Sequence, residues 1–347
     1  MRKSERLCKA VVLPDKSSST GHRSEMSLWM LCSDEEFSPD LVRAALERGE
    51  DVNQRGPNNW SLLMFAAAKN KIPFLRLMLE QPLIELNLVC DEGTTAFQYA
   101  AIRGHGEALK LLLEHPSISV NLVSGAGFTA LHMAACQGKS EAVKLLLADP
   151  RVDVNCKGPD GFTPLLLAAQ NADNFDVLQL LLADQRFDVN YVASFSLPSG
   201  RKMVTTALMR ATAGKNFKAV KLLLEDDRVD VNWMDGDGLH ALDYSPMDTR
   251  ILELFLSHPR VDLNCKTELG LTGQNVLHGA VIENNIEALR MILADTRFAS
   301  HNALDKKGRS AAFIAAINGY WDIFKELVHH PKVDLAVSGL GPDDLIW

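Results

Sequence analysis

The sequence predicts an all-α protein, a right-handed solenoid of stacked helix–loop–helix units joined by finger-like β-hairpin loops in one elongated domain. Three recurring phrases predict this fold class. A phrase such as RVDVN, which ends in Asn, returns mostly every 34 residues; a phrase with a Gly and an Ala–Ala pair follows it, and a Leu-rich phrase such as EAVKLLLA comes next. Such a period is typical of an array in which each unit packs only on its neighbours, and it favours one stack over two globular domains.

Composition and charge exclude several classes of protein. The 347 residues include 36 basic and 44 acidic side chains and carry a net charge of −8, which argues against a nucleic-acid partner because phosphate contacts need clustered Lys and Arg. No apolar run is long enough to insert into a membrane, and the apolar stretch near the start is too short for a secretion signal. The 6 cysteines lie singly, so we expect a reducing compartment, cytoplasmic or nuclear. We also expect a monomer without metal or cofactor.

Each phrase has a physical role in the predicted unit. Gly127 and Gly161 stand where the finger must turn tightly, since glycine tolerates a positive φ. Thr163 and Pro164 open a helix, because Thr caps N–H groups and Pro suits the first turn. The Ala–Ala pairs keep the first helix thin, and the Leu-rich second helix is buried between layers. The residues expected to form this structural motif are Thr129, His132, Thr163, Pro164, His278, Asn121, Asn155 and Asn232.

Together the phrases give G-x-T-P-L-H-x-A-A, then V-x-L-L-L, then D-V-N. This pattern resembles the ankyrin repeat, over roughly Met26 to Ala336, with units mostly one residue longer than the family's usual 33. The resemblance implies helix pairs that bind proteins through the finger tips and the exposed side of the first helices. We expect about nine units, at 26–53, 54–87, 88–121, 122–155, 156–190, 191–232, 233–264, 265–302 and 303–336.

The two ends of the chain depart from the pattern. Residues 1–25 are polar and are predicted to be disordered. The first unit lacks the T-P-L-H phrase and carries charge in its first helix, which is typical of a terminal cap. Residues 337–347 are predicted to form a capping tail whose last residues pack on the ninth unit.

The region from Asn190 to Gln274 is irregular. About eight extra residues before Thr206 should lengthen one finger, and Pro246 should shorten or break the first helix of the next unit. A three-residue insertion follows at 271–273. These changes are either tolerated drift, since repeat loops accept insertions cheaply, or a specialised contact surface or hinge.

The sequence contains no catalytic constellation. Gln137–Ser140 matches only the end of a phosphate-binding loop, because the required earlier glycine is missing. Asp235–Gly238 begins like a calcium loop, yet Pro246 stands where the closing Glu belongs. His132 and His278 are expected to hydrogen-bond to neighbouring loops. We therefore expect no enzymatic activity.

The variable positions of the unit are the candidate partner contacts. Large apolar residues follow the finger turn at Trp60, Phe128, Phe162 and Leu239, where they would either line an exposed edge or cover their own turns. The positions after the Ala–Ala pair add a mixed surface, and the irregular region adds aromatic residues. These further candidates are Ile102, Arg103, Gln137, Gln170, Asn171, Tyr191, Phe195 and Trp233.

The resemblance implies a non-catalytic scaffold or adaptor that holds one or more partner proteins along its concave face and finger loops. The acidic fingers at Asp91–Glu92 and Asp160 favour a partner segment with Lys or Arg and apolar anchors. The alternative is the targeting subunit of a larger regulatory complex, such as a ubiquitin-ligase or signalling adaptor. That alternative requires a second recruiting surface.

Overall fold

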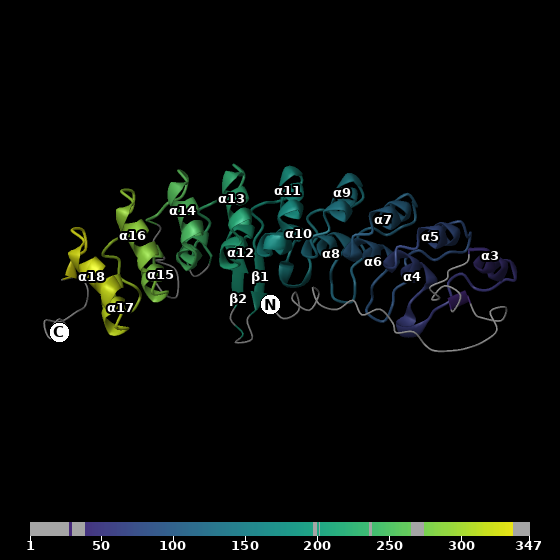
Figure 1. The fold of residues 1–347 in the computed structure, drawn as a ribbon, viewed down its shortest axis with the longest axis horizontal. Helices are drawn as coiled ribbons and strands as arrows, with labels where there is room; N and C mark the ends of the chain where they lie inside the picture. The colour runs from purple at the N-terminus through teal and green to yellow at the C-terminus, as the bar shows by residue number, and fades with distance from the viewer. Residues whose placement is uncertain are drawn as a thin grey trace. The chain divides into compact units, whose positions relative to one another are not determined.

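The computed structural model describes residues 28–29, 39–196, 200, 202–235, 238–264 and 274–335. They form paired, stacked helices, so the predicted all-α class is confirmed (Figure 1). By its internal contacts the chain divides into two compact bodies. The N-terminal body comprises Met1–Ala168 with Asp176–Phe187, and the C-terminal body comprises Ala169–Phe175 with Asp188–Trp347.

In the N-terminal body the helices form two rows, and each helix packs on the next of its row. The inner row consists of α4 (Leu62–Ala68), α6 (Ala96–Arg103) and α8 (Ala130–Cys136). The outer row consists of α3 (Pro39–Glu47), α5 (Ile72–Leu79), α7 (Gly106–Leu113) and α9 (Ser140–Ala148). Short 3-10 turns occur in two finger loops, as η2 (Pro57–Asn59) and η3 (Pro159–Gly161).

The C-terminal body repeats this arrangement. Its inner row is α12 (Ala207–Ala213), η5 (Ala241–Met247), α15 (Val276–Ile282) and α17 (Ala311–Ile317). Its outer row is α13 (Phe217–Glu225), α14 (Thr249–Ser257), α16 (Ile286–Ala294) and α18 (Trp321–His329). The borders of the two bodies fall in the segment made of α10 (Pro164–Gln170), η4 (Ala172–Asn174) and α11 (Phe175–Ala183).

Local hydrogen bonds determine where the inner helices begin and end. The Thr95 hydroxyl accepts a hydrogen bond from the Gln98 amide at 3.2 Å, and the Ser310 hydroxyl accepts one from the Phe313 amide at 3.1 Å. These bonds satisfy amides that have no partner within the helix. Helix α6 ends where Gly104 takes a left-handed φ of 73°, a conformation that suits glycine.

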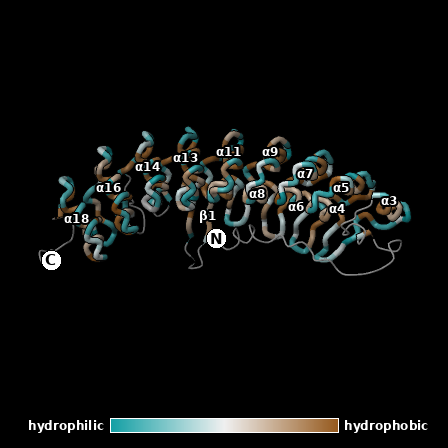
Figure 2. Tube along the Cα trace, in the orientation of Figure 1, coloured by the Kyte–Doolittle hydropathy of each residue, from teal (hydrophilic) through white to brown (hydrophobic). Residues whose placement is uncertain are grey.

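The core lies between and within the two rows of helices. The paired alanines of α6 and α8, such as Ala100 and Ala134, are fully buried, and their small size lets neighbouring inner helices approach closely. Leucines of the outer row, such as Leu109, Leu112 and Leu146, fill the layer between rows. Hydrophobic and hydrophilic segments therefore alternate along the helices of each body (Figure 2).

Finger loops precede the inner helices where the structure describes the connecting residues, and a backbone hydrogen bond closes several of these fingers. The Ser124 amide donates to the Phe128 carbonyl at 2.9 Å, and Gly127 completes the turn with a φ of 84°. The finger before η5 is closed in the same way, by the Asp235 amide and the Leu239 carbonyl at 2.9 Å. The turns are thus held in a fixed geometry.

The finger before α12 is longer and forms a β-hairpin. Its strands β1 (Ala193–Ser196) and β2 (Lys202–Thr205) pair antiparallel, with Ala193 opposite Thr205 and Ser196 opposite Lys202 (Figure 1). This hairpin accounts for the extra residues of the sequence before Thr206. Among the described residues it is the one finger in which named strands pair.

The effect predicted for Pro246 is present. The first helix of its repeat is the 3-10 segment η5 rather than an α-helix, because Pro has no N–H to donate within the helix. The predicted disordered start 1–25, the insertion at 271–273 and the tail 337–347 lie outside the described residues. The borders of the nine units stay a prediction.

Candidate functional site

The anchor asparagines join neighbouring repeats. Asn121 Nδ2 donates a hydrogen bond to the Arg151 carbonyl at 2.7 Å, and Asn121 Oδ1 accepts one from the Asp153 amide at 2.9 Å. The side-chain amide bonds a carbonyl of the following loop in the same way at Asn53, Asn87, Asn155, Asn190, Asn232, Asn264 and Asn302. The loop geometry is therefore set by contacts between repeats.

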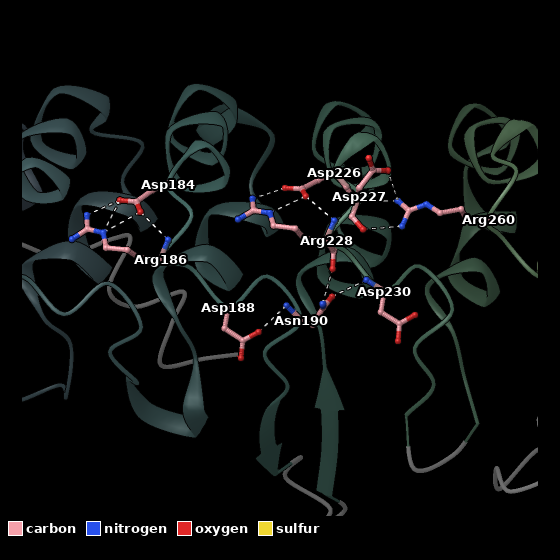
Figure 3. Close-up of polar contacts among 9 residues, drawn as sticks. All are labelled: Asp184, Arg186, Asp188, Asn190, Asp226, Asp227, Arg228, Asp230 and Arg260. Carbon is pink, nitrogen blue, oxygen red and sulfur yellow. Dashed lines mark hydrogen bonds and ion pairs between the residues drawn. The ribbon is translucent and has the colours of Figure 1, made fainter.

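Figure 3 shows this contact in the C-terminal body. Asn190 Nδ2 donates to the Arg228 carbonyl at 2.7 Å, and Asn190 Oδ1 accepts from the Asp230 amide at 2.7 Å. Asn190 is the residue that precedes the hairpin finger. The start of the hairpin is consequently fixed to the loop of the next repeat.

A second contact, the Asp-x-Arg clasp, follows several outer helices. Arg186 Nη2 donates to Asp184 Oδ2 at 2.6 Å (Figure 3). It also donates to the Leu147 carbonyl at 2.7 Å, near the end of the preceding outer helix α9. The hydrogen bonds from Arg186 lower the pKa of the Asp184 carboxyl. Other Asp-x-Arg ion pairs are Asp149–Arg151, Asp226–Arg228 and Asp295–Arg297. The clasp satisfies a carbonyl that has no partner in its own helix.

Arg260 reaches the preceding repeat without an Asp two residues before it, because His258 stands at that position. Its guanidinium donates to the carbonyls of Asp226 and Asp227 at 3.1 and 3.2 Å, and it lies 3.9 Å from the Asp227 carboxylate (Figure 3). These polar contacts hold the stack together. They occupy the residues' hydrogen-bonding groups and present no substrate site.

The histidines of the T-P-L-H position hydrogen-bond to the finger of the next repeat, as expected. His132 is fully buried, and its Nε2 lies 2.9 Å from the Phe162 carbonyl of the next finger. His278 Nε2 lies 3.2 Å from the Arg309 carbonyl. Burial lowers the pKa of His132 to about 4, so the ring is neutral at pH 7.

A buried thiol adjoins this histidine, yet it is not activated. Cys156 Sγ lies 3.5 Å from His132 Nδ1 and 3.3 Å from Thr129 Oγ1. Burial raises the pKa of the Cys156 thiol to about 11. A nucleophilic cysteine needs a lowered pKa and access to solvent, so these three residues form a packing contact.

Of the two predictions for the residues after the finger turn, the exposed aromatic edge is wrong. Trp60, Phe128 and Phe162 are all buried. The Trp60 ring packs on Tyr99 of the next repeat with centroids 4.4 Å apart, and Phe128 meets His132 edge-on. A large ring at this position covers the turn and the repeat interface, because burial there gains more free energy than exposure to water.

The candidates that follow the Ala–Ala pair differ in burial and belong to both bodies. Ile102 is buried, Arg103 and Asn171 are exposed, and Gln137 and Gln170 are partly buried. The Gln170 side chain accepts a hydrogen bond from Arg210 within the C-terminal body, and Asn171 caps the short turn that follows it. Gln170 and Asn171 thus hold local structure within that body.

The candidates of the irregular region lie in two consecutive fingers of the C-terminal body. Tyr191, Phe195, Trp233 and Leu239 are all partly buried. Phe195 pairs with Met203 across the hairpin, so both side chains lie on one face of the two strands. The next finger adds the exposed Met234.

The sequence predictions missed one recurring position, the second residue after the anchor Asn. Large hydrophobic side chains are exposed there in four fingers, at Val89, Val123, Met234 and Leu304. The sequence holds part of this signal, because five of the eight residues in this column are apolar. The other three, Arg55, Lys157 and Lys266, are basic and obscure the pattern.

The described part of the chain holds no cluster of three or more His, Cys, Asp or Glu residues that could bind a metal. Its cysteines Cys90, Cys136 and Cys156 are buried thiols. No helix within the described ranges has both the length and the apolarity needed to cross a bilayer.

Comparison with known proteins identifies the repeat. No curated protein matches the chain. The sequence model of the family described as ankyrin repeats (3 copies) matches residues 29–124, 118–193 and 245–337, and no catalytic domain is evident. The stretch between the last two matches, 194–244, contains the hairpin β1–β2 apart from its first residue, Ala193. Ankyrin repeats are in general modules of protein–protein interaction, and they are typically non-catalytic. Because the matched residues make up most of its length, the chain belongs to the ankyrin repeat family.

Proposed function

We propose that the chain is a non-catalytic scaffold or adaptor that binds a partner protein through its finger loops. The observation that carries this proposal is the row of exposed side chains second after the anchor Asn. Ten large hydrophobic residues are exposed within the described ranges, and four of them occupy this one position. They are 43–56 % exposed, at Val89, Val123, Met234 and Leu304.

The finger geometry supports binding. Val89 and Val123 each lie just before a turn closed by a backbone hydrogen bond, from the Cys90 amide in one finger and the Ser124 amide in the other. A loop already held in one conformation loses little entropy when it binds. Burial of apolar surface contributes about 25 cal/mol per Å² of apolar area, so a row of such residues can anchor a partner.

In the C-terminal body the row has neighbours that extend it. Trp233 stands directly before Met234, and Tyr191 and Phe195 belong to the adjacent hairpin finger. Leu239 closes the finger of Met234 through its carbonyl. We place the aromatic part of the partner contact on the partly buried Tyr191, Phe195 and Trp233, with Leu239 beside them, in place of the buried Trp60, Phe128 and Phe162.

The test compares affinity capture by the full chain and by two double variants. Val89→Ser with Val123→Ser removes the row from the N-terminal body, and Met234→Ser with Leu304→Ser removes it from the C-terminal body. Leu83→Ser is the matched control, because Leu83 is 79 % exposed but lies in the loop before the anchor Asn. Circular dichroism checks that each variant folds.

At least one double variant is expected to lose bound proteins that the wild type and Leu83→Ser retain. Retention of every bound protein by both double variants would reject the finger row. Equal loss in Leu83→Ser would show that the losses follow from surface hydrophobicity in general.

A further inference from the structure

A second exposed apolar surface lies away from the fingers, at the turns that join α15 to α16 and α17 to α18. Ile282 and Ile317 end the inner helices and are 42 % and 54 % exposed. Trp321 begins α18 and is 54 % exposed, and Ile286 begins α16 and is partly buried. We call Ile282, Ile286, Ile317 and Trp321 the terminal strip.

The four residues come from two repeats that pack together. Helix α15 lies beside α17, and α16 lies beside α18 (Figure 1). Asn284 and Gly319 take left-handed φ values of 52° and 70°, so each turn reverses the chain within three residues. Ile286 also lines a groove of about 480 Å³ between α16 and α18, together with Asp322.

The terminal strip is not needed to build a repeat. In the N-terminal body, Ile102 occupies the position of Ile282 and is only 8 % exposed. Gly106 and Ser140 stand where α16 and α18 have Ile286 and Trp321. Small residues thus suffice at the start of α7 and α9, whereas α5 begins with the partly buried Ile72. Of the two large residues here, Ile286 is partly buried and Trp321 is left exposed to water.

The charges beside the terminal strip are acidic. Glu283, Glu287 and Asp322 are exposed, and none of them makes an ion pair with another described residue. Glu287 and Asp322 stand in the first turns of their helices, where the helix dipole also favours a carboxylate, but Glu283 follows the end of α15.

Basic groups lie farther along the same groove. Arg290 pairs with Glu326, its Nε donating to Oε1 at 3.0 Å, so these two charges offset each other. Lys325 and His329 line the groove toward the end of α18. The apolar end of the groove is therefore the acidic one.

We propose that the terminal strip docks a segment of a partner protein that carries two large apolar side chains flanked by Lys or Arg. The apolar side chains would pack on Ile317 and Trp321, and the cationic groups would meet the three carboxylates. A nucleic acid or an acidic segment would be repelled. This surface goes beyond the proposed function, because it is a second docking surface with its own ligand chemistry.

The probe is a synthetic peptide selected on the full chain from a random displayed library. We expect selected peptides that combine an apolar pair with Lys or Arg. Binding is then titrated against the wild type, Ile317→Ser with Trp321→Ser, Glu283→Gln with Asp322→Asn, and the finger variant Val89→Ser with Val123→Ser.

The apolar double variant is expected to weaken peptide binding about tenfold or more. The charge variant should weaken binding less and reduce its dependence on salt, since exposed charges are screened. The finger variant should bind as the wild type does, which keeps this test separate from that of the proposed function. A benzophenone-bearing peptide should cross-link within residues 282–287 or 317–322, a readout that does not depend on any variant folding.

Any one of four outcomes would overturn the proposal. Selected peptides could bind the apolar double variant as tightly as the wild type, or cross-link to the finger loops. The strip-dependent peptides could be acidic. Finally, the wild type could self-associate in sedimentation while the apolar double variant stays monomeric, which would make a second copy of the chain the occupant.

Discussion

Asn121 connects two repeats through Arg151, whose carbonyl accepts a 2.7 Å hydrogen bond from Asn121 Nδ2. The same side chain also accepts the Asp153 amide. Asn121→Ala leaves both backbone groups without this partner and is expected to lower the free energy of unfolding by about 1–3 kcal/mol. Denaturant unfolding followed by circular dichroism measures it. Asn318→Ala is the control, because that side chain donates within its own helix segment and should change stability by less than about 0.5 kcal/mol.

The buried histidines should make the stability of the folded chain depend on pH. Burial holds the pKa of His132 at about 4, below its ordinary value, so the unfolded chain binds this proton more readily than the folded chain. Stability is then full above about pH 6.5, falls as the pH drops through this range and levels off below about pH 4. His132→Gln should flatten that decline, as measured by urea unfolding at a series of pH values.

Glutamine is the appropriate replacement because the chain already uses it. Gln98 occupies the same position in another repeat, where its Nε2 donates to the Phe128 carbonyl at 3.2 Å. His132→Gln can keep the bond to the Phe162 carbonyl without a titrating group. An unchanged decline between pH 6.5 and 4 in this variant would mean that other groups, such as His278, account for the acid sensitivity.

The repeat itself could be predicted from the sequence because its determinants are local. A Thr or Ser three residues before a helix amide, a Gly at the finger turn and an Ala–Ala pair each act within a few residues of their own position. The effect of Pro246 was predictable for the same reason. Recurrence of these local signals every 34 or so residues gave the stack.

Which side chains are exposed was harder to predict than the repeat, because the burial of a residue depends on the neighbouring repeat. Trp60 is covered by Tyr99, which lies 39 positions further along the chain, and no local pattern reveals that contact. Ile102 and Ile282 occupy the same position and are the same residue type, yet one is buried and the other exposed. The terminal strip therefore needed the structure, whereas the column of Val89 and Val123 was visible in the sequence.

The clasp of Arg186 should depend on the shape of its guanidinium. Arg186 binds Asp184 through two nitrogens and at the same time reaches the Leu147 carbonyl. Lys cannot make this fork, so Arg186→Lys is expected to cost about 1 kcal/mol of stability in denaturant unfolding. Arg250→Lys is the matched control, because Arg250 pairs with Asp248 but is far more exposed. Equal losses in the two variants would assign the effect to the ion pair rather than to the bond between repeats.

Substitution of two finger glycines can distinguish the cost of backbone strain from the cost of a steric clash with the neighbouring finger. Gly93 and Gly308 occupy equivalent turns, with φ values of 66° and 72°. At Gly308 an added Cβ meets nothing within 4 Å, so Gly308→Ala should cost about 1–2 kcal/mol, the strain of a left-handed alanine. At Gly93 the Cβ would lie 2.5 Å from the Gly125 nitrogen, which donates to the Glu92 carbonyl at 3.0 Å.

Gly93→Ala must therefore push two fingers apart and is expected to cost about 3 kcal/mol or more, measured as a shift in the thermal unfolding midpoint beside Gly308→Ala. The fingers that carry Val89 and Val123 are the ones that separate, so this variant should also weaken capture of any partner that depends on both valines. A Gly93→Ala chain as stable as Gly308→Ala would show that neighbouring fingers move independently, and a partner would then have to order them on binding.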